Sequence, residues 1–74
     1  MKEVEKVANV LKGFGYEIRI EGDSVFYIAF NDNGTVNRVV EIDCTRKASR
    51  YKVDVWSDWE QWTDDEWKFE WEEV

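Results

Sequence analysis

Carboxylates and tryptophans alternate in the last third of the chain, and they are the residues with the most potential for chemistry. Residues 54–74 hold nine of the 17 acidic side chains and all five tryptophans, against one lysine. Two carboxylates held at a suitable separation can cleave a glycosidic bond. A chain of 74 residues, however, has little material with which to enclose a substrate. The sequence therefore predicts a protein that is not an enzyme.

Metal and cofactor chemistry finds little support in the residue types. The chain has no histidine, one cysteine and no glycine-rich phosphate loop, which argues against zinc sites, Cys-His nucleophiles and nucleotide folds. An EF-hand alignment on Gly34 fails, because it puts Ala29 and Val40 at ligand positions. The acidic run 64–66 is more typical of a first helical turn or a solvated loop. We expect no cofactor and no metal ion.

The charge is divided unequally, with a net of +1 over residues 1–53 and −8 over residues 54–74. Such acidity opposes binding to nucleic acid or to anionic membranes. The expected partner is a basic protein, including one that itself binds nucleic acid, and the carboxylates would then mimic phosphates in an inhibitor. Small, acidic, cysteine-poor domains of phages often act in this way, an analogy of composition. The candidate partner-binding residues are Asp58, Glu60, Asp64, Asp65 and Glu66 for charge, with Trp59 and Trp62 as anchors that could be buried or exposed.

Length and hydropathy predict one soluble domain over residues 1–74. Cys44 cannot form an intramolecular disulfide, which favours a reducing compartment. The N-terminal residues alternate in charge, unlike a signal peptide, and the chain has no apolar run long enough to cross a membrane. These features favour a cytoplasmic location.

The first half of the chain gives the clearest structural pattern. Residues 2–12 read as an amphipathic helix, followed by strands over 16–21, 24–31 and 35–43. Gly22-Asp23 and Asn33-Gly34 are signals for two-residue hairpin turns. The helix has an apolar stripe of Val4, Val7, Ala8, Leu11 and Phe14.

Two-residue turns also fix which residues lie opposite one another. Ile20 then pairs with Val25, and Val25 with Ile42 on the next strand. One apolar face results, which should pack on the helix. Its members are Tyr16, Ile18, Ile20, Val25, Tyr27, Ala29, Val40 and Ile42.

The opposite face of this sheet carries four large apolar residues, which an isolated monomer would rarely expose. The tryptophan segment, a second copy or a foreign partner could cover them. An alternative function is therefore a homodimeric structural protein. A third possibility is a module whose tryptophans stack on a sugar or cage a cation. The patch consists of Phe26, Ile28, Phe30 and Val39.

The sequence after the third strand allows more than one structural interpretation. The basic residues Arg46, Lys47, Arg50 and Lys52 read as a solvated loop that neutralises nearby acids. A fourth strand is expected over 50–56. Residues 63–73 fit either a fifth strand, pairing Val55 with Trp67, or a C-terminal helix behind a capping box. The expected fold is α+β, an N-terminal amphipathic helix packed on an antiparallel meander of four to five strands.

Overall fold

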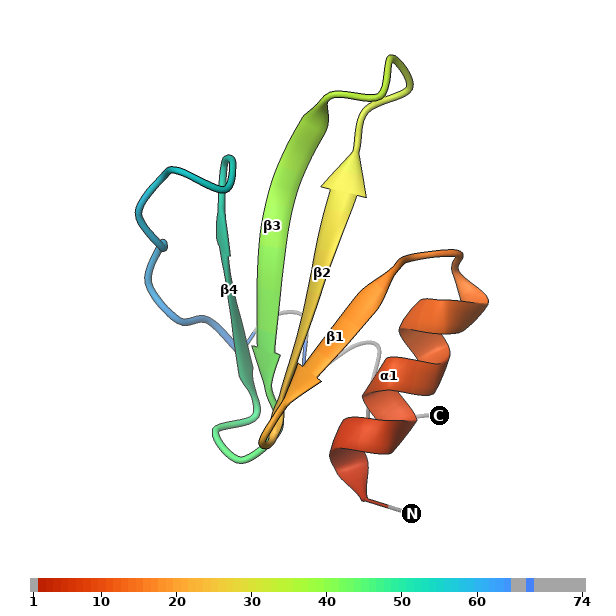
Figure 1. Cartoon of the computed structure of the whole chain (residues 1–74). Coiled ribbons are helices and arrows are strands. Elements are labelled where there is room, and N and C mark those ends of the chain that lie inside the picture. Colours follow the sequence, from red (N-terminus) through yellow and green to blue (C-terminus); the bar gives the residue numbers. More distant parts are fainter. Residues whose placement is uncertain (1, 65–66, 68–74) are drawn as a thin grey trace.

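The computed structural model describes residues 2–64 and Trp67. One helix precedes four strands, and each strand is antiparallel to the next in the sheet order β1-β2-β3-β4 (Figure 1). The α+β fold expected from the sequence is confirmed. The elements are α1 (Glu3–Gly13), β1 (Ile18–Glu21), β2 (Ser24–Phe30), β3 (Val36–Asp43) and β4 (Ala48–Lys52).

Both the apolar stripe and the charges at the two ends of α1 favour a helix over these residues. Glu3 and Glu5 lie in its first turn and Lys12 in its last, as the helix dipole favours. Gly15 follows the C-cap with φ of 92°, a left-handed conformation that favours glycine after the end of a helix. Phe14 falls outside the helix and is exposed, which corrects its assignment to the stripe. The other stripe residues, Val4, Val7, Ala8 and Leu11, are buried.

The first hairpin has the predicted geometry. Glu21 lies opposite Ser24 across the two-residue turn, and Ile20 lies opposite Val25. Gly22 has φ of 58°, which a first central residue of a type II′ turn requires and glycine adopts readily. The turn therefore fixes the register that aligns the apolar face of β1 with that of β2.

The second hairpin differs from the prediction at its tip. The amide of Asn31 donates to the carbonyl of Thr35, so the loop has three residues instead of the two expected at positions 33–34. Phe30 then pairs with Val36, and one extra β3 residue follows as a β-bulge before the next pair. The bulge offsets the longer loop, so pairs further from the tip keep the register that a two-residue loop would give.

The hydrophobic core lies between α1 and the face of the sheet that the sequence predicted. Trp67 joins this core with 4% of its surface exposed. Ile20 is 46% exposed although it belongs to the same face, because it lies near the turn end of an edge strand. The buried cluster comprises Val4, Val7, Ala8, Leu11, Val25, Tyr27, Val40, Ile42, Cys44 and Trp67.

The chain after β4 corrects the predicted fourth strand. The strand ends at Lys52, because the Asp54 side chain accepts hydrogen bonds from the Trp56 amide and the Ser57 hydroxyl and closes a turn. Val55 lies in this turn and therefore outside the strand pairing expected for it. The alternatives for residues 63–73 concern positions that, apart from 63, 64 and 67, lie outside the described residues.

The segment 57–64 then runs back along the outer edge of β4 (Figure 1). The Glu60 amide donates to the Tyr51 carbonyl over 2.8 Å, and Ser49 and Thr63 exchange two backbone hydrogen bonds of 2.8 Å. The segment thus covers part of the β4 edge, which would otherwise present unpaired backbone groups. From there the chain reaches Trp67 in the core on the helix side.

Candidate functional site

The face of the sheet opposite α1, called here the second face, collects the basic residues near the β4 edge. Arg50 lies opposite Glu41, and Lys52 lies opposite Val39. Side chains two residues apart on a strand share a face, so Arg50 and Lys52 project side by side. The two side chains form a row of cations against which the segment after β4 can pack.

Two tryptophans of the returning segment interleave with these cations. Lys52 Nζ lies 4.6 Å from the Trp59 ring centre, and Arg50 Cζ lies 4.7 Å from Trp59 and 4.5 Å from Trp62. Arg46 Cζ lies 4.5 Å from Trp62. The order Lys52–Trp59–Arg50–Trp62–Arg46 defines the tryptophan–cation stack. Cations over aromatic faces are attracted by the ring quadrupole, so the stack fastens the segment to the sheet.

Carboxylates beneath the stack balance its charge. Arg50 Nη2 lies 2.8 Å from Glu41 Oε1, and Arg50 Nε donates to the same oxygen over 2.9 Å. Glu41 is 8% exposed and also accepts from the Ser24 hydroxyl. Arg46 forms a longer ion pair of 3.6 Å with Asp43. Arg46 and Arg50 therefore neutralise nearby acids, as the sequence predicted for this cluster. The four basic residues lie on β4 and the turn before it, and they pack against aromatic rings.

The sequence did not identify the stack, although one signal for it was present. Strand periodicity places Arg50 and Lys52 on one face, and in the structure Trp59 contacts both of these cations. Strand periodicity does not predict the path of the chain after β4, because that path depends on the turn closed by Asp54. Both rings face Arg50, so the chain's own cation takes the place that a ligand cation would occupy between them.

The proposed binding residues fall into two groups in the structure. Trp59 and Trp62 are half-buried, whereas Trp56 is 91% exposed. The acidic candidates Asp58, Glu60 and Asp64 are exposed. The candidates Asp65 and Glu66 lie outside the described residues. The described segment thus presents carboxylates and one fully available indole to solvent.

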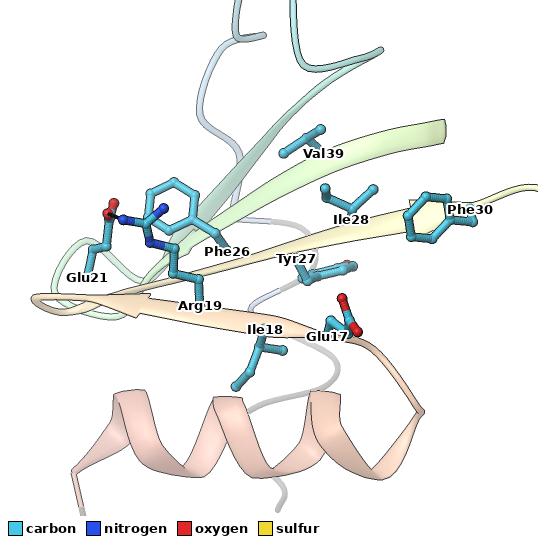
Figure 2. Close-up of a pocket in the computed structure, with 9 residues that line it drawn as sticks. All are labelled: Glu17, Ile18, Arg19, Glu21, Phe26, Tyr27, Ile28, Phe30 and Val39. Carbon is cyan, nitrogen blue, oxygen red and sulfur yellow. Dashed lines mark ion pairs between the residues drawn. The ribbon is translucent and has the colours of Figure 1, made fainter. Parts of the chain in front are cut away.

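The apolar patch expected on the second face lines an open depression of about 360 Å³ (Figure 2). Phe26, Ile28, Phe30 and Val39 all contribute to it, with Arg19 and Glu21 at its β1 side. Trp59 covers part of the patch, because its ring centre lies 6.3 Å from that of Phe26. Phe30 remains 60% exposed at the far end.

Cys44 is the chain's one thiol, and it is buried. Burial, together with the nearby carboxylates of Glu3, Asp43 and Asp23, raises the pKa of the Cys44 thiol from 9.0 to about 11, and burial is the largest of these causes. A thiol held in its neutral form is a poor nucleophile. Within residues 2–64 and Trp67, no three carboxylate or thiol side chains gather in a way that could hold a metal ion.

Comparisons with known proteins found no matching family model, no similar curated protein and no similar solved structure. No helix in the described part of the chain is long and apolar enough to cross a membrane. The function must therefore be argued from the residues themselves.

Proposed function

We propose that this protein is a small, non-enzymatic binding module that uses the acidic segment along the β4 edge to contact a basic protein. The partner is a protein that itself binds nucleic acid, and the module inhibits it by occupying its phosphate sites. The exposure of Trp56, at 91% and beside the exposed carboxylates of Asp58 and Glu60, is the observation that carries this proposal.

Exposed tryptophan is costly in water and is enriched among residues that dominate binding energy. Trp56 differs from Trp59 and Trp62, whose faces are occupied by the chain's own cations. In this proposal Trp56 is the anchor, in place of Trp59 and Trp62, which were predicted as anchors from the sequence. Trp59 and Trp62 hold the segment in place, which lowers the conformational entropy lost on binding.

The arrangement of charge supports a basic partner. Arg46 and Arg50 are paired with Asp43 and Glu41 on the sheet, so these cations do not neutralise the carboxylates of the outer segment. Exposed carboxylates such as Asp58 and Glu60 raise the rate of association with a cationic surface, and salt lowers that rate by screening them. Duplex DNA would compete for the same surface of the partner.

The proposal is tested by capturing proteins from a cell lysate on the immobilised full-length chain. The washes use about 0.1 M and about 0.5 M salt, because the higher value shortens the screening length about twofold. A parallel capture contains excess duplex DNA. We expect a basic, nucleic-acid-binding protein to be retained at low salt and to be displaced by both treatments.

Matched charge reversals make the test specific to the site. Asp58→Lys with Glu60→Lys should abolish capture, because both exposed acids lie beside Trp56. Glu5→Lys with Asp32→Lys changes the net charge equally at exposed positions elsewhere and should preserve capture. Equal retention of the partner by both double variants would contradict the proposal.

A further inference from the structure

The outer edge of β1 is the second feature of the sheet that invites an interaction. Among the described residues β1 has β2 as its strand neighbour on one side, and its other side forms the edge of the sheet (Figure 1). Edge strands present rows of backbone donors and acceptors that can pair with another strand. The β4 edge, by contrast, is partly paired with the returning segment.

The turn determines which backbone groups of β1 point outward. A two-residue hairpin is closed by a hydrogen-bonded pair, here Glu21 and Ser24, and such pairs alternate along an antiparallel ladder. The backbone groups of Glu21 and Arg19 therefore point toward β2. Those of Ile18 and Ile20 point away from β2, and no other strand within residues 2–64 pairs with them.

We propose that residues 16–20, which comprise Tyr16, Glu17 and the first three residues of β1, pair antiparallel with the same residues of a second copy of this chain, with Ile18 opposite Ile18 of the partner subunit. The Tyr16 amide already donates to the Leu11 carbonyl over 3.2 Å, so in this register Tyr16 contributes its side chain and not its amide. In this register Arg19 lies opposite Glu17 of the partner subunit, and the two-fold axis repeats that pair. On the helix side, Ile20 lies opposite Tyr16 of the partner subunit. Opposite charges and apolar side chains thus meet at every position, as stable cross-strand pairs require.

Neighbouring registers are less favourable. Moving the axis to Arg19 sets two arginines against each other and Glu17 against Glu21 of the partner subunit, so like charges face. Moving it to Ile20 pairs Arg19 with Glu21 of the partner subunit but leaves Ile18 opposite a turn glycine. The self-complementary sequence of residues 16–20 therefore favours the Ile18 register.

Two further observations fit this pairing. Ile20 is 46% exposed on the core face, and pairing would bury it against Tyr16 of the partner subunit. Arg19 already lies beside Glu21 at 3.0 Å, with both side chains mostly exposed, so this ion pair can exchange for one with Glu17 of the partner subunit at little cost. Figure 2 shows Arg19 and Glu17 at the β1 side of the apolar depression.

Helix α1 is compatible with the paired sheet. It packs against both β1 and β2, so it lies about one strand spacing of roughly 5 Å from an axis beside β1. Two such helices would then be about 10 Å apart, which is an ordinary distance for packed helices. The resulting eight-stranded sheet would carry the two acidic segments at its opposite ends and make the binding module bivalent.

Charge-swap variants test the pairing by sedimentation equilibrium of the full-length chain. Arg19→Glu should weaken the dimer by at least about tenfold, because it sets like charges opposite each other twice. Adding Glu17→Arg to that variant restores opposite charges and should return the dissociation constant to within about threefold of the original. Glu21→Arg is the control, because Glu21 has no charged residue opposite it in the Ile18 register.

The outcomes separate the proposal from its alternatives and from the binding function. A monomeric mass at about 1 mM protein would overturn the dimer, since that concentration detects even weak association. Dissociation by Glu21→Arg, or failure of Glu17→Arg to rescue Arg19→Glu, would overturn the Ile18 register. Capture of a basic partner depends on Asp58 and Glu60 at the other edge of the sheet. The capture experiment and the sedimentation experiment can therefore fail independently of each other.

Discussion

At the residue scale, Arg50 connects the sheet to the segment that carries the proposed function. Its guanidinium lies between Trp59 and Trp62 and pairs with the buried Glu41. Arginine suits this position because a planar guanidinium can stack on two rings and still hydrogen-bond at its edge. The same side chain thus satisfies a buried carboxylate and orders the returning chain.

Replacing Arg50 should reveal both roles. We expect Arg50→Ala to lower the free energy of unfolding by about 2–3 kcal/mol, because Glu41 is left buried without its cation. Arg50→Lys keeps the charge but loses planar stacking and should cost about 1 kcal/mol. Urea unfolding followed by tryptophan fluorescence measures both values. Lys12→Ala, at an exposed helix position, serves as a control expected to change stability by less than about 0.5 kcal/mol.

The buried thiol gives a second prediction at this scale. With the pKa of Cys44 raised to about 11, its alkylation by iodoacetamide at pH 8 should be roughly a hundredfold slower in the native protein than in urea. The raised pKa also means that the neutral thiol favours the folded state at low pH, and stability falls as pH rises from about 9 to about 11. Mass spectrometry of quenched samples follows the reaction, and equal rates in the two states would contradict the assignment.

At the element scale, the β2–β3 hairpin shows that the length of a loop and a nearby β-bulge together set the strand register. The sequence predicted a two-residue loop there, and the structure has three residues with Gly34 at φ of 86°. Three-residue loops commonly place glycine in the left-handed position. The compensating bulge preserves the pairing of Tyr27 with Val40, so the buried face is unchanged.

Substituting Gly34 should test this backbone requirement. A Cβ added at Gly34 meets nothing within 4 Å, so Gly34→Ala should cost about 1 kcal/mol through its positive φ alone. Gly13→Ala is the matched control, because that position is helical and equally open. It should stabilise the protein by about 0.5 kcal/mol. Thermal unfolding of the two variants should therefore shift in opposite directions.

At the scale of the whole molecule, the two edges of the sheet differ in chemistry. One edge carries the acidic segment and Trp56, and the other carries the self-complementary strand β1. The hydrophobic core packs on one face of the sheet, and the tryptophan–cation stack packs on the other. Stability and binding should therefore respond to different tryptophans.

Trp56→Ala tests that separation. Because Trp56 is almost fully exposed and its amide still reaches Asp54 in the variant, stability should change by less than about 0.5 kcal/mol. Capture of the basic partner should weaken at least about tenfold, as expected for a binding anchor. Trp62→Ala should instead lower stability, since it removes contacts with Arg46 and Arg50. Unchanged capture by the Trp56 variant would contradict the anchor role.

The sequence by itself determined the helix, the first three strands and the residues that form most of the core. Those features depend on local periodicity and turn chemistry, which neighbouring residues specify. It also located the patch of Phe26, Ile28, Phe30 and Val39, because strand alternation assigns faces directly. It placed the end of β4 wrongly, since alternation continues past Lys52 while the Asp54 side chain closes a turn.

Only the tertiary structure decided which tryptophans are available to a partner. Trp59 and Trp62 are half-buried against cations of β4 and its turn, whereas Trp56 is 91% exposed. Local patterns carry no information about such contacts until the path of the chain is known. The acidic composition pointed to a basic partner, and the packing of the returning segment determined which indole could serve as its anchor.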